Sequence, residues 1–416
     1  MKIYQQLFRQ LDEVGTLSRG KSKHRPRNDP VLYGGLHPFI QTGDVKHSNF
    51  YVTSHSQTYS DMGLAQSKLW PAGTLCITIA ANIADTAILA FPACFPDSII
   101  GFKAKDGVSS TAYIKYCLDT YKTQMRSISQ GTTQDNLSQG KLLSLKFRIP
   151  DYATQKKIAA ILSAYDDLIA NNQRRITLLE RMAEDIYREW FVRLRFPGHA
   201  QVKIEKGMPQ GWHFADLSEM AGINTSSIRK GTQSERIFYI DISAVSTNHI
   251  DDLTDMALAD APGRARRLVK HGDVVWSSVR PANRAYCLIY EPLENLVAST
   301  GFAVISPKRG FPFTFINFAV TSDSFVEQMA MVAKGSAYPA TSFDDFGKAK
   351  IICPSPALLA RFHEICEPMF KRRHQLRLAN AALAKQRDAL LPRLISGKLA
   401  VDSLDIRFPP GMEVLD

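Results

Sequence analysis

Two segments of the chain repeat apolar residues at the spacing of a coiled coil. The first runs without glycine or proline from Thr154 to Trp190, and its apolar positions alternate at intervals of four and three residues. This pattern predicts one long helix that packs against another helix. Its predicted core consists of Ile158, Leu162, Tyr165, Ile169, Asn172, Ile176, Leu179 and Ile186, continued by Ala183 and Trp190.

Asn172 is the polar exception in that core. A buried Asn at such a position fixes the register of the paired helices at some cost in stability. The alternative is an Asn that faces solvent where the helices diverge, and the sequence leaves both open.

A second heptad segment follows near the end of the chain. One of its columns is apolar and consists of Phe362, Met369, Leu376, Leu383 and Leu390. The other column is more polar and includes Arg373, Asn380 and Arg387. Proline lacks the N–H that a helix interior needs, so we expect Pro368 to kink or delay this helix and Pro392 to bend its end.

The regions before and between these helices have the short apolar runs of a mixed α/β domain. Residues 75–79 and 273–276 read as strands, each preceded by a turn containing glycine, and residues 303–305 read as another strand. The order of the strands does not follow from the pattern.

The chain also repeats itself at a distance of about 200 residues, which is the length of a domain. The matching segments are Pro38–Val45 with Phe238–Val245, Gly101-Phe102 with Gly301-Phe302, Gln130-Gly131-Thr132 with Lys334-Gly335-Ser336, and Ile149-Pro150 with Cys353-Pro354. The repeated unit is therefore a mixed domain followed by a long helix.

These patterns predict an α+β chain with two globular α/β domains separated by two long helices. In a pseudo-two-fold repeat the helices are expected to form an antiparallel coiled coil. The predicted segments are a first domain at 1–150, a helical region at 151–196, a second domain at 197–355, a second helical region at 356–400 and a tail at 401–416.

The composition adds a basic charge to this picture. The chain has 416 residues, with 51 Lys and Arg against 40 Asp and Glu, a net charge of +11. Such a balance favours polyanions or anionic membranes as partners. No apolar run is long enough for a membrane span, and the first residues lack the features of a secretory signal.

The six cysteines are expected to be reduced, mostly buried thiols in a cytoplasmic protein. None lies in a C-x-x-C pair, and no histidines stand at the spacing of zinc ligands. The sequence therefore predicts no metal site.

Several ordered motifs together resemble one protein family. Residues 38–45, 58–60, 70–74, 101–102, 130–138 and 145–150 resemble the target recognition domain of type I restriction-modification specificity subunits. The helix from Ile161 to Phe191 is similar to the central conserved region of that family, and Gln386–Leu399 resembles its C-terminal conserved region. In the second domain, Tyr338-Pro339-Ala340-Thr341 replaces the pattern Gln134-Asp135-Asn136-Leu137. This departure leaves open which DNA sequence the domain would read, but it does not change the family resemblance.

The resemblance implies a division of roles. Each recognition domain would read one half of a bipartite, asymmetric site in double-stranded DNA. The paired helices would set the spacer between the half-sites and dock two copies of the methyltransferase (modification) subunit. Motor-nuclease (restriction) subunits would complete the complex, and this chain would need no cofactor.

DNA recognition requires cationic side chains for phosphates and Arg or Asn for base edges. The loop from Arg19 to Arg27 is rich in both charge and polarity, and residues 1–150 have 17 Lys and Arg against 10 Asp and Glu, a surplus of seven. The DNA-binding candidates are Arg19, Lys21, Ser22, Lys23, Arg25, Arg27, Arg264, Arg266, Arg267, Arg280, Asn283 and Arg284. The alternative for each is ordinary solvated surface.

Gly131 and Gly335 occupy matching places in the two halves. Each is explained either by a turn that needs positive φ or by a loop whose backbone approaches DNA.

No catalytic motif was found in the chain. It lacks the Asn/Asp-Pro-Pro-Tyr/Phe motif of amino-methyltransferases, a glycine-rich cofactor loop and a P-loop. We therefore expect a non-catalytic chain. The rival hypotheses are a chain with cryptic methyltransferase or nuclease activity and a coiled-coil scaffold whose globular domains bind proteins.

Overall fold

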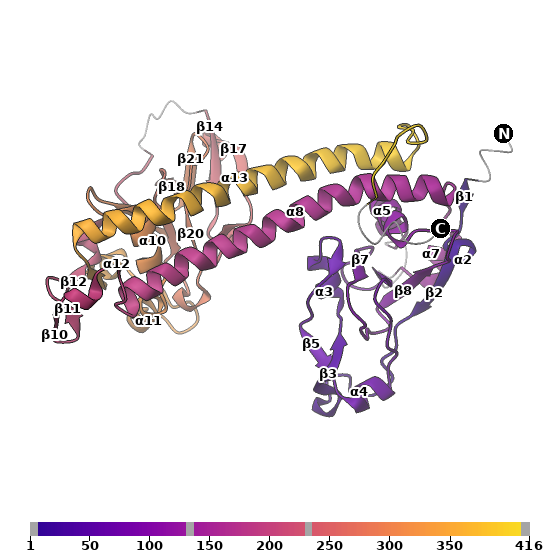
Figure 1. Ribbon diagram of the computed structural model, residues 1–416, viewed down its shortest axis with the longest axis horizontal. Helices are drawn as coiled ribbons and strands as arrows, with labels where there is room; N and C mark the ends of the chain where they lie inside the picture. The colour runs from indigo at the N-terminus through magenta and orange to yellow at the C-terminus, as the bar shows by residue number, and fades with distance from the viewer. Residues whose placement is uncertain (1–6, 130–136, 229–234, 409–416) are drawn as a thin grey trace. The chain divides into compact units, whose positions relative to one another are not determined.

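The computed structural model describes residues 7–129, 137–228 and 235–408 (Figure 1). The chain forms two compact units. The first unit consists of residues 1–172 and 379–416, and the second of residues 173–378. Each unit therefore contains one globular domain and one part of each long helix.

The first unit is built on a five-stranded sheet. Its strands, in spatial order, are β2 (Gly15–Arg19), β8 (Ile99–Ala104), β6 (Leu75–Thr78), β7 (Thr86–Leu89) and β4 (Tyr51–Val52). Two further pairs are β3 (Tyr33–Phe39) with β5 (Gln57–Tyr59) and β1 (Phe8–Arg9) with β9 (Phe147–Arg148). The domain's helices are α2 (Leu11–Val14), α3 (Thr42–His47), α4 (Asp61–Ala65), α5 (Thr111–Thr120), α6 (Lys122–Ser129) and α7 (Gln139–Ser144). Every residue of β6 and β7 is buried, and the predicted strand at 75–79 is confirmed.

The second unit has two four-stranded sheets. One contains β13 (Ala221–Ile223), β22 (Phe302–Pro307), β19 (Val274–Ser277) and β20 (Tyr286–Leu288). The other contains β17 (Thr254–Ala257), β14 (Arg236–Ile240), β21 (Leu296–Ser299) and β18 (Ala265–Leu268). Three two-stranded pairs are β12 (His213–Asp216) with β23 (Lys350–Cys353), β10 (Ile204–Glu205) with β11 (Met208–Pro209), and β15 (Val245–Ser246) with β16 (His249–Ile250). The domain's helices are α9 (Leu217–Met220), α10 (Phe313–Thr321), α11 (Asp323–Val332) and α12 (Phe343–Lys348). The strands predicted at 273–276 and 303–305 are both present.

The two heptad segments form the long helices α8 (Tyr152–Tyr187) and α13 (Pro356–Ile395). A π-type turn at Arg188–Val192 follows α8. Every residue of the predicted helix core is buried or half-buried, and none is exposed, so the heptad prediction is confirmed.

The expectation that Pro368 delays the second helix was wrong, because α13 begins at Pro356 and continues through it. Pro368 lies on the exposed face of α13. The carbonyl that loses its helical hydrogen bond there can be solvated, which lowers the penalty of an internal proline. Pro392 also lies within α13, close to its end at Ile395.

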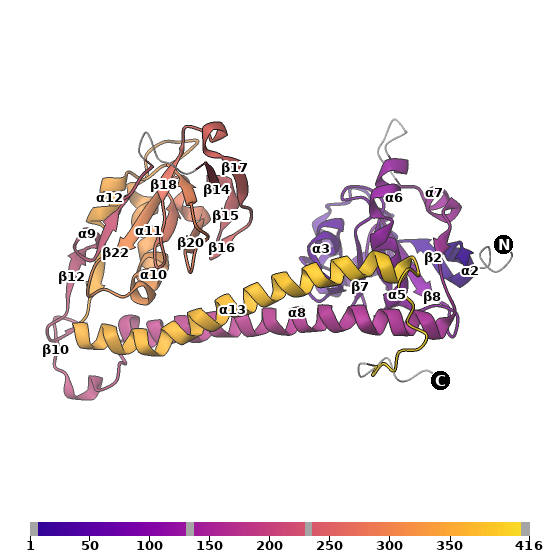
Figure 2. The same cartoon turned by 90° about the horizontal axis from the view of Figure 1, so that it is seen from above.

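The polar column of α13 explains how the helices pair. In the first unit, Arg387 forms an ion pair with the buried Asp166, and the amide of Asn172 donates to Asn380 at 2.9 Å. In the second unit, Arg373 contacts Glu180 at 3.3 Å. The residue numbers of the partners on α13 fall as those on α8 rise. Within each unit the two helices are therefore antiparallel (Figures 1 and 2).

Asn172 is half-buried and paired with another Asn, which favours the register-fixing interpretation over the solvent-exposed one. The three polar residues of the α13 column thus each meet a polar group of α8, and none is left unpaired in the seam.

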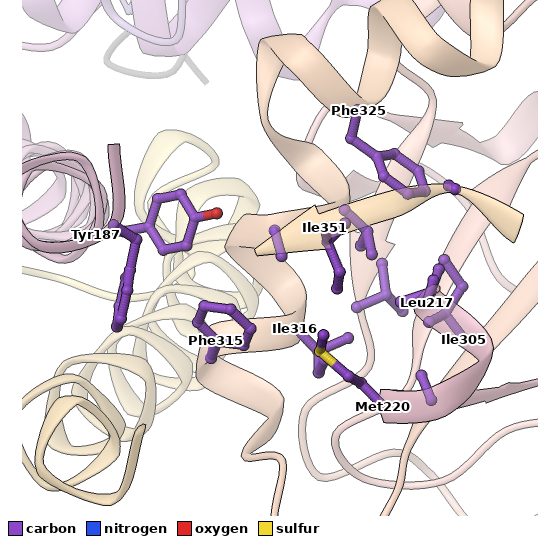
Figure 3. Close-up of a cluster of buried hydrophobic side chains, with 14 of the residues drawn as sticks. Tyr187, Leu217, Met220, Ile305, Phe315, Ile316, Phe325 and Ile351 are labelled. Carbon is purple, nitrogen blue, oxygen red and sulfur yellow. The ribbon is translucent and has the colours of Figure 1, made fainter. Parts of the chain in front are cut away.

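Each unit has its own apolar core, made of three clusters of buried side chains. The largest cluster in the second unit joins both sheet and helix residues (Figure 3). In that view, Tyr187 of α8 faces Phe315 of α10, while Leu217, Ile305 and Ile351 come from the domain. The long helices are therefore part of the domain cores and not separate from them.

The repeat holds at the level of packing. Ile40 and Val45 lie in one core cluster of the first unit, and Ile240 and Val245 lie in one core cluster of the second. The helix after β1 and the helix after β12 both begin with a capping box, Gln10 with Glu13 and Asp216 with Glu219.

One predicted match within the repeat was wrong. Leu75, which begins β6, pairs with Phe102, whereas Val274, which begins β19, pairs with Ile305. The counterpart of Phe102 is therefore Ile305, and Gly301 stands before β22 begins. The two glycines meet different constraints, because a Cβ would collide with Trp70 at Gly101 and with Ile242 at Gly301.

Candidate nucleic-acid interface

The basic loop of the first unit leaves β2 at Arg19 and is fastened at three points. The amide of Lys21 donates to the carbonyl of Phe95 at 3.1 Å, and the side-chain oxygen of Gln66 accepts from the amides of Lys23 and His24. A Cβ on Gly20 would lie 2.2 Å from the Phe95 carbonyl oxygen, so only glycine fits there. The backbone of this loop is thus held in place under its basic side chains.

The structure separates the predicted contacts of this loop into two groups. Arg25 donates to the carbonyls of Ser22 and His24, and Arg27 forms an ion pair with Asp97 at 2.9 Å. These two arginines stabilise the loop itself. Ser22 is 7% exposed, so its side chain packs inside the domain and is too buried to contact DNA.

Arg19, Lys21 and Lys23 form the other group. All three are exposed, and none has an ion-pair partner within the described ranges. The prediction that the loop binds phosphate therefore rests on these three side chains.

On β18 and just before it, two of three candidate arginines have structural roles. Arg264 donates to the carboxylate of Asp241 at 2.6 Å. Burial alone would raise the pKa of Asp241, but hydrogen bonds from Ser243 and the charge of Arg264 lower it below its ordinary value. Arg267 is half-buried over the ring of Phe343, and burial lowers the pKa of this guanidinium. Arg266 alone of the three is exposed and unpaired among the described residues.

The connection between β19 and β20 carries the remaining candidates. Arg284 forms an ion pair with Asp323 at 2.6 Å, which raises the pKa of the arginine. Arg280 and Asn283 are exposed. The guanidinium of Arg280 lies 4.6 Å from the centre of the Tyr338 ring, a cation–π contact.

Tyr338 and Lys334 were not predicted from the sequence as site residues. Both are exposed, in the segment 334–338, and Tyr338 is 69% exposed. A large aromatic residue in a polar, glycine-containing segment was the available signal. Gly335 has φ of +108°, so the predicted positive-φ turn is confirmed there. Gly131, with Gln130 and residues 132–136, lies outside the described residues.

Comparison with known proteins gives the family. A family model for the type I restriction modification DNA specificity domain matches residues 6–181. A type I restriction enzyme specificity subunit, MjaIX of Methanocaldococcus jannaschii, is 23% identical over 420 residues, 95% of this chain and 94% of that protein. The chain belongs to the family of type I restriction-modification specificity subunits.

Two further relatives agree with this assignment. The HindI specificity subunit of Haemophilus influenzae is 26% identical over 136 residues, 32% of this chain and 30% of that protein. The crystal structure of a type I restriction-modification S subunit from M. genitalium has a TM-score of 0.59, with 17% identity and 96% of each chain covered. That likeness shows a shared fold for this specificity subunit. The resemblance stated from the motifs is confirmed.

The second unit of this specificity subunit also has a cleft of about 600 Å³ between α8, α13 and the start of α11. Six of its charged lining residues form ion pairs with one another: Glu180 pairs with Arg373, Glu184 with Arg188 and Asp323 with Arg284. A seventh, Arg193, pairs with Glu189 outside the lining. No group of three or more His, Cys, Asp or Glu in the described ranges is placed to hold a metal ion. The six cysteines carry free thiols, and five of them are buried.

In the part of the chain that the structure describes, no helix has both the length and the apolar content of a membrane span.

Proposed function

We propose that this chain is the DNA sequence-specificity subunit of a type I restriction-modification complex, in which each recognition domain reads one half of a bipartite, asymmetric site. The observation that carries the proposal is the duplication itself. Each unit has its own core and its own exposed cationic residues, Arg19, Lys21 and Lys23 in the first and Arg266 and Arg280 in the second. Two separate readers suit a target with two separate parts.

The paired helices would set the unread spacer and dock two methyltransferase subunits, which motor-nuclease subunits would join in the cytoplasm. Polar pairs between α8 and α13 fix a single register, as a ruler requires. In the second unit, Leu178 and Met182 on α8 and Val192 in the turn after it are 56%, 51% and 62% exposed. Apolar residues left exposed on a helix are available to a partner protein.

The chain would catalyse nothing by itself, and the methyl transfer would belong to its partner. Incubating the purified chain with DNA and a labelled methyl donor tests this directly. Incorporation of label without the methyltransferase subunit would contradict it.

Mapping methylated adenines in DNA from cells with and without this chain tests the whole proposal. We expect methylation at one bipartite sequence that disappears when the chain is deleted. Unchanged methylation in the deletion strain would reject the function. Binding to duplex DNA should also weaken as salt rises, with a log–log slope that reflects several phosphate contacts. A flat salt response would favour the protein-binding scaffold instead.

The spacer role has its own test. Inserting one heptad in α8 and one opposite it in α13 lengthens the pair by roughly 10 Å, or about three base pairs. The spacer in the methylated sequence should grow by about that number while both half-sites stay the same. An unchanged spacer would remove the ruler role.

A further inference from the structure

The connection between β19 and β20 holds Arg280 in an unusual backbone conformation. Its φ is +49°, in the left-handed region that residues other than glycine rarely adopt. The counterpart in the first unit, Ala81 in the β6–β7 connection, has φ of +46°. The strained turn is thus common to both units, and only the second unit places a long cationic side chain on it. Such strain persists where the surrounding structure enforces it, often at a functional site.

A hairpin formed by residues 334–340 enforces this conformation. Lys334 and Ala340 exchange two backbone hydrogen bonds of 2.9 Å, which close the loop. The amide of Arg280 donates to the Pro339 carbonyl at 2.7 Å. Behind it, the amide of Thr341 donates to Ser278 at 2.9 Å. Two segments far apart in the sequence therefore fix the position from which the Arg280 side chain leaves.

The side chain itself is oriented but not neutralised. Its guanidinium lies over the ring of Tyr338, and one nitrogen donates to the carbonyl of Ala337 at 3.3 Å. No carboxylate pairs with it among the described residues, in contrast to Arg284 in the same connection, which pairs with Asp323. Most of the five N–H donors of Arg280 are left available on the surface.

This arrangement matches the chemistry of base reading. A guanidinium presents two parallel N–H donors that fit the O6 and N7 acceptors of guanine in the major groove. Stacking on an aromatic ring fixes the plane of the guanidinium before DNA binds, so less side-chain conformational entropy is lost on binding. Lys334, exposed at the base of the hairpin, is placed to meet a phosphate.

We propose that Arg280 reads a guanine in the half-site of the second recognition domain, and that Tyr338 is the residue that positions it. This inference rests on the proposed function. It adds the base that is read, the domain that reads it and the two side chains responsible.

The test is to map methylated adenines on a plasmid library with a randomised second half-site. The cells carry the methyltransferase subunit with either the wild-type chain or a variant. For Arg280→Ala we expect discrimination at one guanine of the second half-site to fall by roughly 10- to 100-fold, with the first half-site unchanged. Arg280→Lys keeps the positive charge but lacks the two parallel N–H donors of the guanidinium, so it should also lose discrimination at the same base pair.

Tyr338 needs a readout that separates positioning from stability. Tyr338→Ala should relax the same base pair as Arg280→Ala, and Tyr338→Phe, which keeps the ring, should restore wild-type discrimination. Arg309 provides the matched control. It is exposed in the same unit and follows the C-terminal end of β22. The opposite end of β22 is the one that pairs with the end of β19, from which the connection with Arg280 leaves. Arg309→Ala should leave the methylated sequence unchanged.

The outcomes are distinct. Relaxation confined to one base pair supports the inference. An unchanged consensus, or a uniform loss at every sequence in a variant whose unfolding midpoint is normal, would overturn it, because a phosphate or structural role would act without regard to base. If methylation does not depend on the wild-type chain at all, the proposed function itself is rejected.

Discussion

The β6–β7 connection of the first unit and the β19–β20 connection of the second contain the same ion pair with its charges exchanged. In the first unit, Asp85 of the connection pairs with Lys122, the first residue of α6, at 2.5 Å. In the second, Arg284 of the connection pairs with Asp323, the first residue of α11, at 2.6 Å. The ion pair is retained in both units, but its acidic and basic residues have exchanged places.

This difference shows which part of the repeat is structural. The attachment of the connection to the following helix is preserved, so it supports the turn in both units. The charge that the connection presents is not preserved: the first connection has no basic residue and ends in Asp85, whereas the second carries Arg280, Asn283 and Arg284. Two readers on one scaffold can therefore present different surfaces to DNA.

The largest effect is expected when the charge of Asp85 in the first unit is reversed. The side chain of Asp85 is 8% exposed and also accepts from Arg126. Asp85→Arg should destabilise the first unit by about 3 kcal/mol, because it places a third cation beside two others in a mostly buried position. Denaturant unfolding measures this change. Adding Lys122→Asp should recover part of the loss, and a double variant no more stable than the single one would show that the pair is not the cause.

A second prediction separates phosphate binding from loop stabilisation in the first unit. Lys21→Ala with Lys23→Ala should weaken DNA binding about 10-fold for every sequence and reduce the salt slope by roughly two, since each lysine neutralises one phosphate. Filter binding or fluorescence anisotropy over a salt series measures both quantities.

The control for that prediction is Arg25→Ala with Arg27→Ala. These arginines bond to the loop and to Asp97, so we expect their loss to lower stability with a smaller change in the salt slope. Equal slopes for the two double variants would contradict the division of the loop into two groups.

The matching charge reversal in the second unit should have a smaller effect. The side chains of Arg284 and Asp323 are 40% and 65% exposed, so water screens the pair. Arg284→Asp should destabilise the second unit by about 1 kcal/mol or less, again measured by denaturant unfolding. A loss as large as that from Asp85→Arg would mean that burial does not set the difference between the two units.

The smallest expected effect is a pH dependence confined to the second unit. His363 of α13 contacts the hydroxyl of Thr314 at 3.1 Å, and burial lowers its pKa despite the nearby acid Glu367. Because the folded pKa lies below the unfolded value of about 6.5, this histidine contributes stability above that pH, and the contribution is lost as the pH falls. Hydrogen exchange at pH 7.5 and 5.5 should show the loss in α10 and α13, and His363→Gln should remove it.

The sequence was a good guide to the helices and a poor one to the individual contacts. The heptad columns predicted the buried faces of α8 and α13, because helical periodicity is local and survives in any packed helix. The repeat predicted two similar domains. A two-residue match such as Gly101-Phe102 with Gly301-Phe302 was too short to fix the strand register, and the pairing of β22 with β19 contradicts it.

The candidate site was only partly predictable for the same reason. Arg19, Lys21, Lys23, Arg266 and Arg280 remain exposed, while Arg27, Arg264 and Arg284 are paired with acids. Nothing in the local sequence distinguishes these two sets. Tyr338 appeared in the sequence as a departure from a family pattern, and its contact with Arg280 became visible only in the folded domain.

The sequence by itself determined the duplication, the two long helices, the basic character and the family, because each of these depends on periodicity, composition or motif order along the chain. Tertiary structure alone decided which candidate cations stay exposed without an acidic partner and which polar residues pair between α8 and α13. Those properties depend on partners such as Asp97 for Arg27 and Asp166 for Arg387, which lie far away in sequence and meet only when the chain folds back on itself.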